Sequence, residues 1–339
     1  MNTGNKILSL CLVLAAFFGM SPEAFAEKRR AEVYYGTAHI DGIKDDAYDK
    51  SDKIEVNFML DGDDNNSKAV CWCLWNDYGL SIFAQVTESS PDSISATLSN
   101  RDSFEVFIDE NNSRGQSADS DDAQYRVGYD GQKSCGMSAS GTDSFLGTSV
   151  VTETGYNVEM YIPFKKNNPG AETVMGFEAQ VNDSINGKRV GVAKWCDETG
   201  DSWQKTVNYG EILLKMGEKS PGDNILVALN GKRMLFDEVE PINIDGRTMV
   251  PLRKIFEELN AEIAWYDSTK TVYAIRNGVL IELAIGSDTY RRNGEILTMD
   301  VPAVIKDGNT LVPLRVIAES FGAEVSWEDE KSLVKIDCK

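Results

Sequence analysis

The stretch Asp102-Ser-Phe-Glu-Val-Phe-Ile-Asp-Glu-Asn-Asn112 alternates apolar and polar residues over its central part. Successive side chains of an extended strand point to opposite faces. Phe104, Val106 and Ile108 would therefore share one face, while Glu105 would project from the other. The pattern predicts a strand that buries one face and carries a carboxylate on the second.

A second stretch, Asp122-Ala-Gln-Tyr-Arg-Val-Gly-Tyr129, has the same period, with its tyrosines and valine on one face and Gln124 and Arg126 on the other. Farther along the chain, Trp203 follows a turn-like run rich in Gly, Asp and Ser, which favours exposure of its ring. An aromatic ring can cover the C–H face of a sugar, and charged side chains can bond its hydroxyls. Glu105, Arg126 and Trp203 are therefore the candidate residues of a sugar-binding face.

The segments around these stretches predict the fold of the first domain. Short alternating runs separated by turn-rich runs, with no helical period, extend to about residue 215. Such a texture is typical of an all-β sandwich, which we assign to residues 27–216. The run Gly217-Glu-Lys-Ser-Pro-Gly-Asp223 breaks the composition, and we assign residues 217–224 to a linker.

Residues 225–339 contain an internal repeat. Residues 245–265 recur as residues 307–327, at an offset of 62, with 12 of 21 positions identical. Each copy holds a proline, Pro251 or Pro313, followed by apolar residues at helical spacing. Asn260 and Gly322 then offer the left-handed conformation that ends a helix. We expect a small duplicated α+β domain.

The first 26 residues have the composition of a secretory signal peptide. Lys6 supplies positive charge, residues 7–18 form a short apolar run, and Ala24-Phe-Ala26 fits a cleavage site. We assign residues 1–26 to a signal peptide. The mature protein is then expected to be secreted or associated with the cell surface, without a membrane span.

The formal net charge of −20 argues against nucleic acids and anionic membranes as partners, because their phosphates would be repelled. It suits an extracellular protein that binds calcium. Asp121 and Asp122 follow a loop that contains Asp119 and offer the oxygen ligands that calcium prefers. The spacing is not that of an EF-hand, so a solvated acidic loop is the alternative.

Five cysteines follow the signal peptide, and their odd number leaves at least one thiol unpaired within the chain. Cys71 and Cys73 share one face of an expected strand. No second pair of cysteines or histidines accompanies them, so zinc is not indicated. We expect small buried side chains rather than a metal or redox site.

The first domain resembles the family 9 carbohydrate-binding modules of secreted xylanases. The resemblance runs from Tyr35-Gly-Thr-Ala-His-Ile-Asp-Gly42 to Tyr209-Gly-Glu-Ile-Leu-Leu-Lys215 and is most specific in residues 102–112, 121–126, 180–183 and 189–203. It implies a β-sandwich with structural calcium and a cleft in which two tryptophans clamp a terminal sugar. The implied function is that of a secreted, non-catalytic protein that binds a poly- or oligosaccharide, namely a plant-type glucan or xylan.

The resemblance also assigns roles by position. Trp203 matches one clamp tryptophan, and Glu105 and Arg126 match residues that hydrogen-bond the sugar. The second clamp position holds Ser99, and a further polar position holds Gly200. The sequence therefore favours a one-sided aromatic platform over a clamp.

The repeat resembles the N-terminal domain of copper amine oxidases, through two Asp-Gly-x-Thr-x-Val-Pro-Leu-Arg blocks that end at Arg253 and Arg315. Copper chemistry is not implied, because the mature chain has a single histidine, His39, in the other domain. We expect a stalk or interaction domain that contacts a cell-wall or surface partner. A partner contact or a structural role remain alternatives for the two arginines.

Other functions compete with sugar binding. A glycoside hydrolase would need a further segment for its catalytic carboxylates, so at most an accessory part of such a system is indicated. A haem site would have to use His39 and Met59. With Ser99 and Gly200 in site positions, the sandwich could instead be an interaction module that has lost sugar binding. Glu105 and Arg126 would then form a plain cross-strand ion pair.

Overall fold

The computed structural model describes residues 29–63, 67–165, 169–217, 225–236, 239–306 and 308–338. The expected signal peptide, all of the expected linker but Gly217, and Asp307 of the second repeat lie outside these residues. The described chain is mostly β-strand, with two short α-helices in the second domain, as expected. No helix within these ranges is long and apolar enough to cross a membrane.

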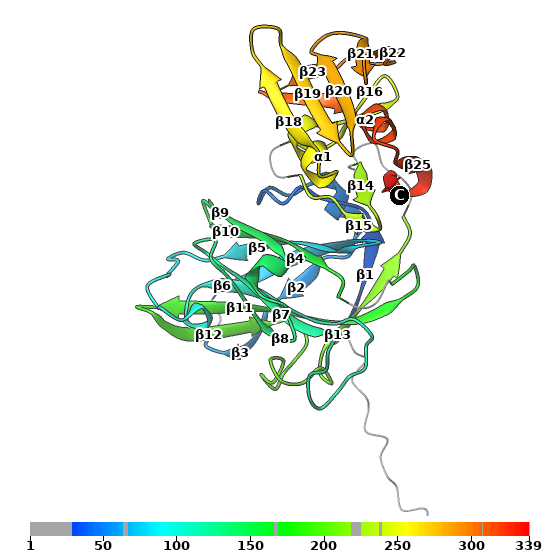
Figure 1. Ribbon diagram of the computed structural model, residues 1–339. Coiled ribbons are helices and arrows are strands. Elements are labelled where there is room, and N and C mark those ends of the chain that lie inside the picture. The colour runs from blue at the N-terminus through cyan, green and yellow to red at the C-terminus, as the bar shows by residue number, and fades with distance from the viewer. Residues whose placement is uncertain are drawn as a thin grey trace, which may run out of the picture.

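The first domain is a β-sandwich of two layers joined by one strand (Figure 1). One layer runs in the order β8 (Lys133–Met137), β7 (Asp122–Gly128), β6 (Ser103–Asp109), β11 (Val174–Ile185) and β13 (Gly210–Lys215). The other runs in the order β4 (Lys68–Asn76), β5 (Gly79–Thr87), β10 (Gly155–Pro163) and β9 (Leu146–Thr152). Strand β1 (Arg30–Tyr35) pairs in parallel with both β13 and β4 and so connects the layers.

Three shorter strands extend these layers. Strand β2 (Ile54–Val56) pairs with β4, strand β12 (Lys188–Lys194) pairs with β11, and strand β3 (Phe58–Asp61) pairs with β12. The β12–β3 extension adds a further edge beside β11. That edge, together with the loop after β12, borders the site described below.

The core lies between the two layers and confirms the predicted alternation. Phe104, Val106 and Ile108 of β6 are buried in one cluster with residues of the opposite layer, and Tyr125 and Val127 of β7 join it. Trp75 and Trp195 also belong to this core. Cys71 and Cys73 are free thiols in the same core, where burial raises the pKa of both. The expected role as small buried side chains is confirmed for this pair.

The described residues of the second domain form three small sheets. The first runs β15 (Lys232–Arg233), β14 (Leu226–Leu229), β26 (Leu333–Asp337), β25 (Glu324–Glu328). The second runs β16 (Ile242–Ile244), β17 (Arg247–Pro251), β24 (Asn309–Pro313), β23 (Val304–Lys306). The third runs β18 (Glu262–Tyr266), β19 (Thr271–Arg276), β20 (Val279–Ala284), β21 (Thr289–Arg292), β22 (Glu295–Thr298).

The predicted duplication is present in this domain. Helices α1 (Leu252–Glu258) and α2 (Leu314–Ser320) each start after the expected proline. Asn260 and Gly322 follow them with φ of 54° and 86°, the left-handed conformation predicted for the helix ends. Val250 of β17 pairs with its repeat equivalent, Val312 of β24, so the two repeats are related by an approximate two-fold axis between these strands.

The two domains pack against each other (Figure 1). Leu226 and Leu333 of the second domain belong to the same buried cluster as the sandwich core. Lys331 Nζ lies 2.6 Å from Asp77 Oδ1 of the sandwich. These contacts hold the second domain in a defined position on the sandwich.

Candidate functional site

A cavity of about 340 Å³ opens on the outer face of β6, β7 and β11, on the side opposite the core. Its lining includes all three predicted sugar-binding residues. It also includes Ser99 and Gly200, the two residues that differ from the pattern expected of the family. Its lining residues are Leu60, Ser99, Glu105, Phe107, Gln124, Arg126, Gln180, Arg189, Val192, Gly200 and Trp203. The residues identified from sequence therefore meet in one place.

Glu105 and Arg126 lie in a row of polar residues that crosses four strands. Strand register places Gln180, Glu105, Arg126 and Ser134 side by side on β11, β6, β7 and β8. Gln180 Nε2 donates to Glu105 Oε1 at 2.8 Å, and Arg126 donates through Nη2 to Glu105 Oε2 at 2.6 Å and through Nη1 to Ser134 Oγ at 2.9 Å. The cross-strand ion pair considered in the sequence analysis is present, and both of its members line the cavity.

Glu105 is the centre of this network. Two more side chains donate to it: Gln124 Nε2 to Oε2 at 2.6 Å and Asn182 Nδ2 to Oε1 at 2.5 Å. Burial alone would raise the pKa of Glu105, but the Arg126 charge and the hydrogen bonds from Asn182, Gln124 and Arg126 bring it below its ordinary value. Glu105 is thus a buried carboxylate that stays ionised and orients its donors.

One buried nitrogen atom of Arg126 is unpaired among the described residues. Its Nε is buried and has no hydrogen-bond partner within the described part of the chain. A buried donor without an acceptor costs about 1–3 kcal/mol. Other atoms of Arg126 line the cavity, so its guanidinium is suited to bind a ligand oxygen.

Trp203 forms the aromatic wall of the cavity and is 58% exposed, as its turn-like setting predicted. The loop that carries it is anchored at Asp197, which accepts hydrogen bonds from Lys194 Nζ at 2.8 Å and from the backbone N–H of Ser202 at 3.1 Å. Tyr209 then donates its hydroxyl to the Ser202 carbonyl at 2.6 Å. The ring therefore projects from a loop that is fixed on both sides.

The Lys194–Asp197 pair is fully buried. Burial opposes ionisation of Asp197, but hydrogen bonds from Lys194, Ser202 and Thr199 and the Lys194 charge hold its pKa well below the ordinary value. The loop anchor therefore stays charged at neutral pH.

Among the described residues, Trp203 is the one tryptophan that lines the cavity, since Ser99 occupies the second clamp position and Gly200 the further polar position. Gly200 has φ of 76°, and a Cβ built there would lie 2.9 Å from Leu60 Cδ2. A side chain at position 200 would be strained and would displace Leu60. The local backbone therefore accounts for glycine, and Leu60 fills the space.

Sequence reasoning missed Gln180 and Asn182 as partners of Glu105, and Arg189 as a partner of Asn182. Arg189 Nη1 reaches Asn182 Oδ1 at 3.4 Å, and Gln180 Nε2 reaches the same atom at 2.8 Å. Both Gln180 and Asn182 belong to the segment that carried the family resemblance. Their contact with Glu105 depends on the pairing of β6 with β11, which a local pattern does not reveal.

Asp121 and Asp122, the predicted calcium ligands, converge with Asp109, and their carboxylate oxygens lie within 4.8 Å of one another. Burial raises the pKa of Asp122 to about 6. Asp122 Oδ1 is buried without a hydrogen-bond partner among the described residues. An orphaned oxygen among three carboxylates fits a hard cation such as Ca²⁺.

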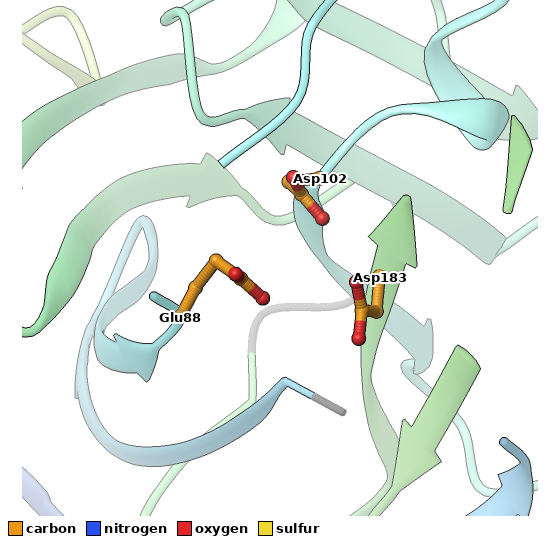
Figure 2. Close-up of side chains that lie close together, drawn as sticks. All are labelled: Glu88, Asp102 and Asp183. Atoms are coloured by element: carbon orange, nitrogen blue, oxygen red, sulfur yellow. The ribbon is translucent and has the colours of Figure 1, made fainter. Parts of the chain in front are cut away.

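A second acidic cluster was not predicted. Figure 2 shows Glu88, Asp102 and Asp183 converging from three separate segments, and their oxygens also lie within 4.8 Å. Burial raises the pKa of Asp102 to about 7, although hydrogen bonds from the backbone N–H groups of Asp92 and Ser184 act to lower it. The hydroxyl of Tyr156 is buried without a partner in the described structure, and its pKa is raised by burial and by these three carboxylates. The donor set again fits a hard cation.

The residues of the haem alternative do not meet. His39 lines a groove at the domain boundary, where its Nε2 lies 3.8 Å from Glu240 Oε1. Met59 lies on β3 and packs against the sandwich core. The structure thus gives no support to a site built from this pair.

A β-sandwich with a polar pocket and one exposed tryptophan on the outer face of a layer has the features of a carbohydrate-binding module. Residues 40–217, more than half of the chain, match the family model described as carbohydrate family 9 binding domain-like. The chain belongs to carbohydrate-binding family 9. Residues 228–336 match the model of the copper amine oxidase N-terminal domain.

The similar proteins agree with this assignment. A region of 185 residues is 40% identical to Exoglucanase XynX of Acetivibrio thermocellus and covers 54% of this chain but 17% of the exoglucanase. A family 9 module from Caldicellulosiruptor kristjanssonii, solved with cellotriose, has a TM-score of 0.52 at 31% identity and covers 64% of this chain and 100% of that chain. A family 9 module from the same organism, solved with glucose, has a TM-score of 0.52 at 32% identity. It covers 57% of this chain and 98% of that chain.

Proposed function

We propose that this protein is a secreted, non-catalytic binding protein that holds a terminal sugar of a β-glucan or xylan in the cavity beneath Trp203. The observation that carries the proposal is the convergence of an exposed tryptophan with the polar row centred on Glu105. The cavity volume of about 340 Å³ is at the lower end for ligand sites, which suits one sugar ring better than a long segment.

Each side chain of the cavity has a different role in the proposed sugar binding. Trp203 would stack on the C–H face of the ring. Arg126, Gln124 and Gln180, which line the cavity, would bond hydroxyls at the rim of the ring. Glu105 acts mainly as a positioning residue, because it is buried and bonded to four side chains.

The matched structures support the ligand class. The family 9 modules from Caldicellulosiruptor kristjanssonii were solved with cellotriose and with glucose. A ligand as small as glucose agrees with a site for a terminal unit. Both matched regions of this chain are described by binding or N-terminal domain models, which supports a non-catalytic role.

Calcium is proposed as a structural ion at the two acidic clusters. Asp109, Asp121 and Asp122 would hold one ion, and Glu88, Asp102 and Asp183 would hold another. A bound cation would offset the repulsion among the buried carboxylates of each cluster. No copper is implied by the C-terminal domain, which we assign the role of a stalk or interaction domain.

Calorimetric titration with glucose, cellobiose and xylooligosaccharides, in the presence of calcium, tests the proposal. We expect saturable heat with at least one sugar and its loss in Trp203→Ala. Ile43→Ala removes an exposed side chain outside the cavity and is the matched control. Absence of heat with every sugar would favour the second candidate, an interaction module that has lost sugar binding, for which Ser99 and Gly200 are the supporting residues.

A further inference from the structure

The duplicated domain contains two grooves that are equivalent under its internal repeat. One is lined by Arg253 and Trp265 of the first repeat and by Thr310 of the second. The other is lined by Arg315 and Trp327 of the second repeat and by Thr248 of the first. Each groove thus contains a threonine from the other repeat. The antiparallel pairing of β17 with β24 about Val250 and Val312 explains this, because it places the threonine of each repeat beside the start of the helix of the other.

Some residues that are identical in the two repeats are exposed, and packing does not explain why they are identical. Leu252 and Leu314 are identical and buried, as a shared core requires. Arg253 and Arg315 are identical and exposed, and so are Trp265 and Trp327, at 45% and 41%. An exposed tryptophan that recurs with an arginine in both grooves indicates a ligand contact.

The indole rings are held in place. Trp327 Nε1 donates to Asp329 Oδ1 at 3.2 Å. Asp267 has the equivalent position after Trp265 and pairs with Lys270, whose Nζ lies 5.9 Å from the centroid of the Trp265 ring. An exposed ring fixed by its own N–H is a stacking platform, since little conformational entropy is lost on binding.

The larger groove, of about 570 Å³, is lined by two arginines and three acidic residues, so it has no excess of positive charge. Arg247 forms an ion pair with Asp300, and Arg315 Nε lies 3.8 Å from Glu319 Oε1. In this groove an anionic polymer would find both arginines paired with acids. In the smaller groove it would meet the single charge of Arg253, and the acidic chain as a whole would repel it. A neutral chain that offers C–H faces and hydroxyls suits the ring and the hydrogen-bonding groups around it.

We propose that these two grooves are a duplicated pair of binding sites for neutral pyranose chains, additional to the cavity beneath Trp203. The pair does not depend on that cavity, because it shares no residue with it. Three sites on one chain would bind a polysaccharide with higher avidity than any one site alone.

Fluorine NMR of the full chain labelled with 5-fluorotryptophan reports each site separately. The chain has 6 tryptophans, and single Trp→Phe variants assign their resonances. The probes are cellohexaose, xylohexaose and chitohexaose, with hexagalacturonic acid as the anionic comparison. We expect saturable shifts of the Trp265 and Trp327 resonances with a neutral hexasaccharide, while those of buried Trp75 and Trp195 stay in place.

Arg253→Ala should weaken the Trp265 isotherm by about tenfold and leave that of Trp327 unchanged, and Arg315→Ala should do the reverse. A shift of Trp203 alone would overturn this inference and leave the proposed function standing. Shifts of Trp265 and Trp327 without Trp203 would support the grooves and contradict the proposed function. The inference would be overturned if the resonance of only one of Trp265 and Trp327 shifted, or if both shifted only with the anionic hexasaccharide. It would also be overturned if the shifts depended on protein concentration in the absence of sugar.

Discussion

Glu105 and Arg126 face each other across β6 and β7, and Arg126 Nη2 lies 2.6 Å from Glu105 Oε2. Both side chains are largely buried, so the pair is little screened by solvent. The same two residues line the cavity beneath Trp203. A change at this pair is therefore expected to affect both the stability of the sandwich and the proposed sugar binding.

Glu105→Gln should destabilise the sandwich. It leaves the Arg126 charge unpaired in a buried setting and places an amide donor among the donors Gln124, Gln180 and Asn182. We expect the free energy of unfolding to fall by about 3 kcal/mol. Urea denaturation measures the change. Lys53→Gln, which breaks an exposed ion pair with Glu55, is the control and should cost less than about 1 kcal/mol. An equal small effect in both variants would contradict the role given to Glu105.

A second aromatic wall should strengthen sugar binding. Ser99 lines the cavity at the position where the sequence resemblance expected a tryptophan. Ser99→Trp is expected to raise affinity for glucose by about tenfold, because a second ring can stack on the sugar. Titration calorimetry gives the affinity, and Ala96→Trp, an exposed neighbour outside the cavity, is the matched control. Equal affinities in the two variants would show that position 99 does not face the sugar.

The anchor of the Trp203 loop gives a third prediction. Asp197→Asn leaves Lys194 fully buried without its charged partner, so the free energy of unfolding should fall by about 3 kcal/mol or more. Sugar affinity should fall as well, because Trp203 loses its fixed position. The low pKa of Asp197 in the folded protein means that its contribution is complete above about pH 4 and is lost as the pH falls below that value. A variant with unchanged affinity would show that the loop is held by its other contacts.

How much of this site is predictable from sequence depends on how local each contact is. Alternation within β6 and β7 placed Glu105 and Arg126 on one face, because side-chain direction in a strand is a local property. Trp203 was placed by its turn-like surroundings. Gln180 meets Glu105 across 75 residues of chain, through a pairing of β6 with β11 that no local pattern encodes. Such partners appear only once the sheet is assembled.

The acidic clusters show the same limit. Asp121 and Asp122 were identified because they are adjacent in sequence, whereas Asp109 joins them only through its pairing with Asp122 across the β6–β7 ladder. The second cluster is formed by Glu88, Asp102 and Asp183, which come from three separate segments. Their spacing in the sequence therefore does not predict that they meet. The repeat of the second domain was fully visible, but the exchange of threonines between its grooves follows from strand pairing.

Calcium should bind at both clusters and stabilise the folded protein. We expect thermal unfolding to shift to higher temperature on addition of calcium and to return on addition of EDTA. Asp122→Asn and Asp183→Asn should each lower the number of bound ions by one, as measured by calorimetry or elemental analysis. Asp63→Asn, at an exposed position outside both clusters, is the control. A stoichiometry unchanged in both cluster variants would contradict the assignment.

The raised pKa of Asp102 gives stability a defined pH dependence in the absence of calcium. Burial places that pKa at about 7, so between about pH 4 and pH 7 the folded protein holds a proton that the unfolded chain has released. The free energy of unfolding should therefore fall as pH rises through this window. Glu159 and Glu178, whose pKa values burial raises to about 8 and about 7, add a slope of the same sign.

Asp102→Asn isolates the contribution of Asp102, because asparagine carries no charge at any pH. In EDTA the variant should lose part of the slope and should be at least as stable as the wild type at pH 8, where the buried carboxylate is ionised. In calcium the order should reverse, because the wild type gains the ion and the variant loses a ligand for it. Urea midpoints at pH 5 and pH 8, with and without calcium, measure all four states. A variant less stable than the wild type at pH 8 in EDTA would mean that Asp102 contributes through its hydrogen bonds to Asp92 and Ser184 and not through a cation.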